Sequence, residues 1–178
     1  MDLEYRDMTM AELDRLREID RSEHVTTGYS MDGGALASRA VDWNVPGWHD
    51  GSGEHSLDYQ IEFSRGHLQA GARFLGCFTP DDLLVGFGLM TPDVEPGVAQ
   101  LSFLHVSHGY RRVGIARELL DRLTDWARAA GATELYVSAA PSESAVSFYQ
   151  AVGFRVTDRP NPDLLALEPQ DIHLRRSL

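Results

Sequence analysis

The chain contains no lysine, and all sixteen of its basic residues are arginine. This bias is typical of a GC-rich bacterial genome, so an arginine in place of a lysine carries no information here. Cys77 is the single cysteine, which excludes an internal disulfide and favours a reducing, cytoplasmic setting. The chain also lacks an apolar run near the ~20 residues that span a bilayer, and we expect neither a signal peptide nor a membrane span.

Acidic residues outnumber basic ones, and the formal net charge is −11. A chain this acidic repels nucleic acid and anionic membranes, so neither is an expected partner. Cationic small molecules and basic peptides are easier partners, although acidity also serves solubility alone. With 178 residues, 43% of them hydrophobic, the chain is long enough for one domain with its own core.

Hydrophobic periodicity and turn residues predict an α/β domain. Asp32-Gly33-Gly34 predicts a hairpin turn, and we expect loops at Trp43–Gly53 and Pro92–Gly97 because of their proline and glycine. The expected strands are Leu3–Met8, Arg73–Phe78, Leu83–Met90, Val98–Val106, Glu134–Ala139 and Ile172–Leu174, the last at an edge of the sheet. The expected helices follow a capping box at Thr9–Glu12, cover Leu57–Leu68, run from Ile115 to Gly131, and follow an N-cap at Ser142.

The most informative segment is an apolar strand that leads through a short turn into a long amphipathic helix. Leu104-His105-Val106 closes the strand, and the turn reads Arg111-Arg112-Val113-Gly114-Ile115-Ala116. Such a turn aims several backbone N–H groups and a helix N-terminus at one place, which makes a site for a diphosphate. The dinucleotide pattern G-x-G-x-x-G is not found near the N-terminus, and a P-loop requires a lysine that this chain lacks.

A second motif follows at a fixed distance. Tyr149 stands 38 residues after Arg111, within Phe148-Tyr149-Gln150-Ala151-Val152-Gly153-Phe154. Together the two motifs resemble the GNAT family, the GCN5-related N-acetyltransferases, which use acetyl-CoA. The resemblance is close over 98–154 and holds in outline over the whole chain. It implies one domain over 1–178 with a mixed, mostly antiparallel central sheet whose central strands splay apart between flanking helices.

The resemblance also implies roles for individual residues. Tyr149 matches the general acid that protonates the departing CoA thiolate, and the Val106 N–H matches the group that polarises the thioester carbonyl. Ser142 stands where the family often has an asparagine that binds pantetheine. The residues expected to bind the cofactor are Leu104, His105, Val106, Arg111, Arg112, Val113, Gly114, Ile115, Ala116, Arg117, Ser142 and Tyr149. No metal is expected.

The general base is missing from its usual positions. Where some members carry a glutamate, this chain has Gln100 or Val137, neither of which accepts a proton. The hypothesis is that catalysis has no dedicated side-chain base and relies on a weakly basic amine or a water relay. Other candidate bases are His105, Ser138, Glu54, His55 and Glu62.

The acceptor side is expected within 24–68, the region that varies in this family. Aromatic and polar residues on the loops there suit a cationic ligand, namely Tyr29, Trp43, Trp48 and His55. The alternative is that Trp43 and Trp48 only close the core. The final strand Ile172–Leu174 would permit a homodimer by strand pairing, as in other members of the family.

The resemblance implies one function, and the missing carboxylates keep a second one open. The first is transfer of acetyl from acetyl-CoA to a primary amine, on a small molecule or a peptide, by direct attack in a ternary complex, since Cys77 has no partner motif for carrying an acyl group. The second is a CoA-binding sensor or regulatory module without catalysis, which the missing carboxylates at Gln100 and Val137 keep open.

Overall fold

The computed structural model describes residues 2–49, 51, 53 and 56–178, which form a seven-stranded sheet and a separate two-stranded ribbon. The sheet order is β1 (Glu4–Asp7), β4 (Arg73–Phe78), β5 (Leu84–Glu95), β6 (Val98–Val106), β7 (Glu134–Ala139), β9 (Ile172–Ser177) and β8 (Arg155–Val156). The ribbon consists of β2 (Glu23–Asp32) and β3 (Ala35–Val45). The β6–β7 pair is parallel, and the other pairs of named strands are antiparallel.

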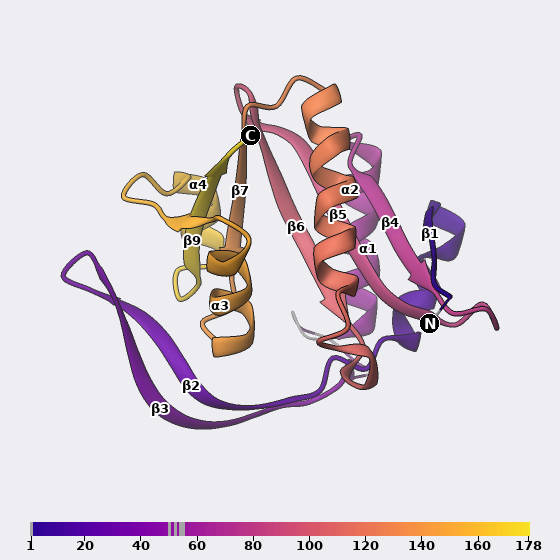
Figure 1. Ribbon diagram of the computed structural model, residues 1–178, viewed down its shortest axis with the longest axis horizontal. Coiled ribbons are helices and arrows are strands. Elements are labelled where there is room, and N and C mark those ends of the chain that lie inside the picture. Colours follow the sequence, from indigo (N-terminus) through magenta and orange to yellow (C-terminus); the bar gives the residue numbers. More distant parts are fainter. Residues whose placement is uncertain (1, 50, 52, 54–55) are drawn as a thin grey trace.

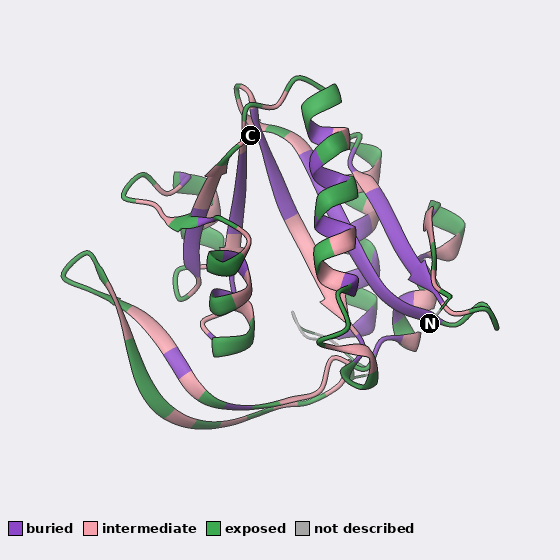
Figure 2. Ribbon diagram, viewed as in Figure 1, coloured by how far each residue is buried: buried purple, intermediate pink, exposed green. Residues whose placement is uncertain are grey.

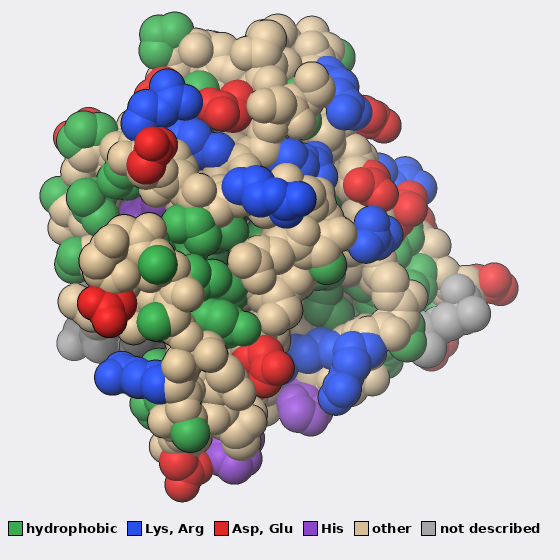
Figure 3. Space-filling model, turned by 60° about the vertical axis from the view of Figure 1, so that its left-hand side comes forward, with side chains coloured by type: hydrophobic (Ala, Val, Ile, Leu, Met, Phe, Trp, Pro, Cys, Tyr) green, Lys and Arg blue, Asp and Glu red, His purple; other side chains and the backbone are tan. Residues whose placement is uncertain are grey.

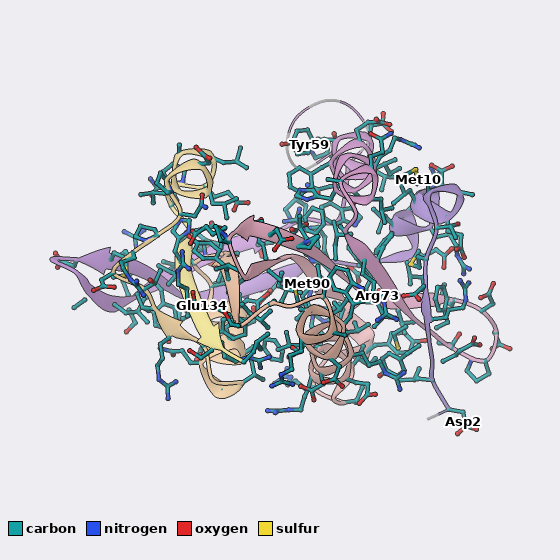
Figure 4. The ribbon with its side chains drawn as sticks, turned by 90° about the horizontal axis from the view of Figure 1, so that it is seen from above. Asp2, Met10, Tyr59, Arg73, Met90 and Glu134 are labelled. Carbon is teal, nitrogen blue, oxygen red and sulfur yellow. The ribbon has the colours of Figure 1, made fainter. Side chains whose placement is uncertain are left out.

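Helices cover both faces of the sheet. The α-helices are α1 (Leu57–Gln69), α2 (Ile115–Ala129), α3 (Glu143–Ala151) and α4 (Pro162–Leu167), and the 3-10 helices are η1 (Met10–Glu18) and η2 (His108–Tyr110). Helices α2 and α3 lie on one face, and α1 and α4 lie on the other (Figures 1 and 4). One hydrophobic core lies under α2 and α3, and a second lies under η1 and α1. No helix in the described residues has the length and apolar character needed to cross a membrane.

Strands β6 and β7 begin side by side and then separate. Their pairing is limited to 98–100 against 134–136, and Figure 1 shows the strands diverging beyond it. Burial changes at the same place, because β6 is buried over its first four residues and only partly buried from Ser102 to Val106 (Figure 2). The expected mixed, mostly antiparallel sheet with diverging central strands is therefore confirmed.

The diverging half of β6 keeps its partner on the other side, strand β5. Leu89 pairs with Phe103 and Met90 with Leu101, so Ser102 is the extra residue of a β-bulge. The Ser107 N–H donates to the Val85 carbonyl at 2.9 Å. Because backbone groups alternate along a strand, those of Leu104 and Val106 point away from β5 and into the gap.

Glycines on β5 let α2 lie close to the sheet. A Cβ added at Gly86 would stand 2.9 Å from Ile115 Cγ2 and 3.3 Å from the His105 carbonyl oxygen. A Cβ added at Gly88 would stand 2.6 Å from Leu123 Cδ1. Since real Cβ atoms do not approach so closely, these glycines set the position of α2 and hence of the turn before it.

Most expected elements are confirmed, and three expectations are wrong. Trp43–Val45 was expected in a loop but belongs to β3, where it pairs with the start of β2. Pro92–Glu95 was also expected in a loop but belongs to β5, because Glu95 pairs with Val98; the register is irregular around Pro92. The strand Ile172–Leu174 is not at an edge, because β9 lies between β7 and the two-residue strand β8. The part of β9 that pairs with β8 is therefore not available to a second copy of the chain, and the homodimer stays a prediction.

Two glycine substitutions should change stability in opposite directions. Gly86→Ala should lower the free energy of unfolding by about 1–3 kcal/mol, because its methyl group meets Ile115 and backbone. Gly66 lies within α1, and a Cβ added there meets nothing within 4 Å. Because alanine favours a helix more than glycine does, Gly66→Ala should raise the free energy of unfolding by roughly 0.5–1 kcal/mol. Denaturant unfolding measures both values, and a neutral Gly86→Ala would contradict the packing described.

Candidate active site

The turn between β6 and α2 forms a backbone cradle that opens outward. Arg112 and Gly114 both have positive φ, +64° and +96°, and Gly114 is the N-cap of α2. The helical hydrogen bonds begin with the Glu118 N–H, which donates to the Gly114 carbonyl at 3.1 Å. The N–H groups of 115–117 therefore precede the helical ladder, and a Cβ added at Gly114 would meet nothing within 4 Å. This geometry suits an anion.

The side chains of the turn divide into two groups. Arg112, Val113 and Arg117 are exposed, so the two arginines are available beside the cradle. Ile115 is 2% exposed and packs under β5, so only its backbone can reach a ligand.

Arg111 faces inward, which sequence reasoning did not predict. Its Nε donates to the Val106 carbonyl at 3.1 Å, and its Nη2 donates to the Arg21 carbonyl at the same distance. Its Nη1 lies 3.5 Å from a Glu23 carboxylate oxygen. The guanidinium thus ties the end of β6 to the segment before β2, and its charge, expected beside the diphosphate, is partly neutralised by Glu23.

The His105 side chain lies on the α1 face of the sheet, away from the backbone edge that faces the gap. Its ring centroid is 5.4 Å from that of Trp48, 5.4 Å from that of Phe87 and 5.8 Å from that of Phe103. Burial, with smaller effects of Arg21 and Arg111, lowers the pKa of His105 to about 4. The ring is therefore neutral and weakly basic at pH 7, and packing is its role.

Tyr149 and Ser142 come from α3. Tyr149 is 7% exposed, and its ring contacts those of Phe148 and Phe154 at 5.3 and 5.5 Å. Burial raises the pKa of the Tyr149 hydroxyl above its usual range, so the hydroxyl stays protonated at pH 7 and can donate. Ser142 caps the helix as expected, with its Oγ accepting from the Ala145 N–H at 3.4 Å.

Asp171 is a titratable residue near Tyr149 that sequence reasoning did not identify. It directly precedes β9, whose first residue Ile172 pairs with Ala139 at the end of β7. Burial first, and then the charge of Glu168, raises its pKa to about 7, and its own charge contributes to the raised pKa of Tyr149. Nothing in the local sequence marks this aspartate, because it lies beyond both motifs and only the return of β9 to β7 brings it near Tyr149.

The two positions where the usual base is missing and the other candidate bases lie in different places. Gln100 and Val137, the two positions without a base, are buried, at 5% and 1% exposure. Ser138 Oγ lies 3.3 Å from His173 Nδ1, and Glu62 pairs with Arg65 at 3.2 Å on the exposed side of α1. Glu54 and His55 lie outside the described residues. Within those residues, no group of three or more His, Cys, Asp and Glu side chains is arranged to hold a metal ion.

The expected acceptor residues separate into two places. Tyr29 and Trp43 belong to the β2–β3 ribbon, where the Trp43 ring packs over Gly28 and the Tyr29 N–H donates to the Pro141 carbonyl at 2.9 Å. Trp48 instead lies beside the diverging half of β6, against His105 and under the Arg21 guanidinium, 4.5 Å from its carbon. Trp48 also packs against the core under η1 and α1, as the packing alternative expects, whereas Trp43 packs within the ribbon.

A row of rings on α1 faces the same half of β6. Phe63 stacks between its neighbours, with centroids 6.2 Å from Tyr59, 4.3 Å from His67 and 5.2 Å from Phe103. Tyr59 is 39% exposed at the outer side of α1 (Figure 4). His67 Nδ1 is 2.8 Å from Thr91 Oγ1, which is 2.8 Å from Ser102 Oγ. None of these polar contacts was predicted, because they join residues far apart in the chain.

The surface beside the gap has mixed character. In the space-filling view, hydrophobic side chains are exposed at the centre of one face, and arginine side chains lie around them, interspersed with acidic ones (Figure 3). The negative net charge therefore does not exclude an anionic ligand from this face.

Comparisons with known proteins agree with this arrangement. A model of the acetyltransferase (GNAT) family matches residues 37–154. Two solved structures superpose over nearly the whole of both chains: a nourseothricin acetyltransferase (17% identity, TM-score 0.73, 99% of each chain) and a putative streptothricin acetyltransferase from Bacillus anthracis str. Ames in complex with acetyl coenzyme A (15% identity, TM-score 0.74, 100% of this chain and 99% of that one). The PaiA N-acetyltransferase from Thermoplasma acidophilum, in complex with coenzyme A, superposes over all of both chains (19% identity, TM-score 0.65).

A curated human protein, the cysteine-rich protein 2-binding protein of Homo sapiens, is 37% identical over 76 residues. The match spans 43% of this chain and 9% of that protein. The three solved structures are 17%, 19% and 15% identical to this chain, and at such low identity their similarity shows a shared fold only.

Replacing Asp171 should reveal the cost of its burial. The carboxyl has an ordinary pKa of 3.8 and a pKa of about 7 in the fold, so between these values the unfolded chain loses its proton first and the folded state loses stability as the pH rises. Asp171→Asn should therefore stabilise the protein increasingly from pH 4 to pH 8. The gain is at most about 4 kcal/mol, reduced by partial exposure of the side chain.

Denaturant unfolding across this pH range measures the gain. Asp81→Asn, an exposed aspartate in the turn between β4 and β5, serves as the control and should show no comparable trend. A gain for Asp171→Asn that is the same at every pH would contradict the burial of this carboxyl.

Proposed function

The chain belongs to the GNAT acetyltransferase family, and from this premise we propose that it transfers the acetyl group of acetyl-CoA to a primary amine of a small molecule or peptide. The observation that carries the proposal is the open edge of β6 at the gap, which leads directly into the backbone cradle at the start of α2. Tyr149 on α3, the helix that follows β7, supports it with a hydroxyl that burial keeps protonated.

The residues present fit acetyl-CoA. The cradle offers N–H groups with open space at Gly114, and Arg112 and Arg117 are exposed beside it, which suits a diphosphate. The outward backbone groups of Leu104 and Val106 suit the amides of pantetheine, which would add to β6 as a further strand. Acetyl-CoA supplies an acetyl thioester that is activated for attack by an amine.

The chain's own groups then have distinct tasks. The Val106 N–H donates to the thioester carbonyl oxygen. The Tyr149 hydroxyl donates to the departing thiolate sulfur. A free tyrosine already makes full proton transfer to a thiolate uphill by about 2 kcal/mol, from reference pKa values near 10 and 8.5. Because burial raises the pKa of Tyr149 further, a hydrogen bond to the sulfur is its main contribution.

Direct attack by the amine is favoured over an acyl-cysteine route. Cys77 is fully buried, and burial raises the pKa of its thiol, so it is neither accessible nor a ready thiolate.

The attacking amine must also lose a proton. Deprotonation at pH 7 costs about 4.6 kcal/mol for a lysine-like amine of pKa 10.4, and about 1 kcal/mol for an α-amine near 7.8.

The acceptor is proposed to approach from the α1 side of β6. The cradle and Tyr149 belong to α2 and α3 on the opposite face, which leaves the face with Phe63, Phe103 and Trp48 for the amine. Aromatic faces attract ammonium groups, so this wall suits a cationic acceptor. The ribbon residue Tyr29 stays a proposed contact from the far side of the gap, next to Pro141.

Tyr149→Phe tests this assignment. It should lower kcat roughly 100-fold because the hydrogen bond to the leaving thiolate is lost, while KM for acetyl-CoA changes little. Release of free thiol from acetyl-CoA in the presence of a panel of amines measures the rate. Tyr5→Phe, at the far edge of the sheet in β1, removes a tyrosine hydroxyl away from the gap and should leave the rate unchanged.

Two outcomes oppose the proposal in different ways. Full activity of Tyr149→Phe would remove Tyr149 from the chemistry. A rise in melting temperature with acetyl-CoA, combined with no thiol release for any amine, would instead indicate the CoA-binding sensor.

A further inference from the structure

Three polar side chains from three elements form one continuous hydrogen-bonded chain from the gap to α1. Ser102 Oγ in β6 lies 2.8 Å from Thr91 Oγ1 in β5, and Thr91 Oγ1 lies 2.8 Å from His67 Nδ1 in α1. Thr91 is 8% exposed, whereas Ser102 and His67 at the two ends are partly exposed. The chain thus connects two accessible ends through a buried middle.

The inner end lies on the diverging half of β6, the half whose open edge faces the gap. Ser102 follows the last paired residues of β6 and precedes Leu104, whose backbone groups face the gap. As the bulged residue, Ser102 turns its side chain toward Thr91 and the α1 face, the side left for the amine. Bulges beside active sites redirect a side chain in this way.

We propose that Ser102, Thr91 and His67 form a proton relay that removes a proton from the acceptor amine before it attacks. This proposal rests on the proposed function and adds the base that Gln100 and Val137 do not provide. Ser102 and Thr91 pass the proton, and His67 is its final acceptor.

The hydrogen bonds have a direction that suits this task. Burial lowers the pKa of His67, so its ring is neutral at pH 7. With its ring proton on Nε2, His67 accepts at Nδ1 from the Thr91 hydroxyl, and Thr91 Oγ1 accepts from the Ser102 hydroxyl. The Ser102 oxygen then has a lone pair for the amine N–H.

The proton transfers balance. The amine arrives as an ammonium ion, and one of its N–H bonds breaks first as the proton joins Ser102 Oγ. The Ser102 proton moves to Thr91 Oγ1, and the Thr91 proton moves to His67 Nδ1, which leaves a cationic imidazolium and two neutral hydroxyls. The neutral amine nitrogen then forms its bond to the acetyl carbon, the carbon–sulfur bond breaks, and the second proton that the nitrogen releases goes to the departing CoA sulfur. The imidazolium then loses a proton to solvent, since His67 is partly exposed.

The surroundings of His67 support both of its states. The rings of Phe63 and Phe103 pack against one another beside it, which keeps the neutral ring partly dry. His67 also stands in the last turn of α1, where the helix dipole favours a positive charge. Glu62 and Arg65 form an ion pair on the exposed side of α1, and because their charges cancel, the pair adds no net charge near His67.

Removing and restoring the middle hydroxyl tests the relay. Thr91→Val keeps the shape but lacks the hydroxyl, and Thr91→Ser keeps the hydroxyl. With a lysine-like amine, Thr91→Val should lower kcat roughly 100-fold, whereas Thr91→Ser should stay within about 3-fold of the natural chain. The loss in Thr91→Val should shrink to about 10-fold or less with an amine of pKa near 7.8, because less help is needed to deprotonate it.

Controls separate this effect from a structural one. Thr124→Val removes another buried threonine hydroxyl, bonded to the Leu120 carbonyl within α2, and should not change how kcat depends on amine pKa. Ser102→Ala keeps the Thr91–His67 bond and should repeat the amine-dependent loss, which covers the case in which Thr91→Val folds poorly. KM for acetyl-CoA should stay unchanged throughout.

The same assay distinguishes the failure of the relay from failure of the proposed function. If the natural chain transfers acetyl groups but Thr91→Val and Ser102→Ala lose nothing, or lose equally with every amine, the relay is overturned and acetyl transfer stands. If the natural chain releases no thiol with any amine, acetyl transfer and the relay both fail.

Discussion

The separation of β6 from β7 is the constraint on which the rest of the site depends. Pairing ends at Gln100 and Tyr136, and beyond it the N–H and C=O groups of Leu104 and the N–H of Val106 have no strand beside them in the described part of the chain. Backbone groups without partners are costly once they are removed from water. An extended ligand with amides of its own would satisfy them, which is why we propose that the separated strands bind pantetheine.

The gap and the cradle are parts of one rigid piece. Strand β6 runs directly into the turn, and Arg111 binds the Val106 carbonyl, so the turn is held against the strand's end. On the other side, Gly86 admits Ile115 and so sets where α2 begins. A ligand that spans strand edge and cradle therefore meets both at a distance that packing has already determined, which reduces the entropy lost on binding.

Local features of the fold were predictable, because neighbouring residues decide them. The capping box at Thr9, the N-cap at Ser142 and the turn at Gly33-Gly34 all involve residues within a few positions of each other. The left-handed conformation of Gly114 likewise follows from glycine at the N-cap. For the same reason the backbone cradle before α2 could be predicted from the amino-acid sequence.

Features that depend on distant segments were not predictable. The position of β9 between β7 and β8 is decided by its pairing with these two strands. The sequence of a short apolar segment does not indicate which strands it will pair with. The inward orientation of Arg111 depends on the Arg21 carbonyl and the Glu23 carboxylate, which are far from it in the chain. Asp171 and His67 reach the site only through the return of β9 and the packing of α1. A motif identifies what surrounds it, whereas these residues belong to the site by tertiary contact alone.

Four titratable groups near the gap share one property, since burial disfavours the charged form of each. Burial keeps the Tyr149 hydroxyl protonated and the rings of His67 and His105 neutral, and it raises the pKa of Asp171 to about 7. Burying a carboxyl in this way costs stability, and such costs are retained where function needs them. For an amine that arrives as a cation and must attack as a neutral nucleophile, the arrangement is consistent. Neutral bases can take its proton, and a protonated tyrosine can donate a hydrogen bond to the departing sulfur. This chain has no carboxylate at Gln100 in β6 or at Val137 in β7. In the proposed relay the base is His67 in α1, so the base has moved from the strands beside the gap to a helix that covers the sheet.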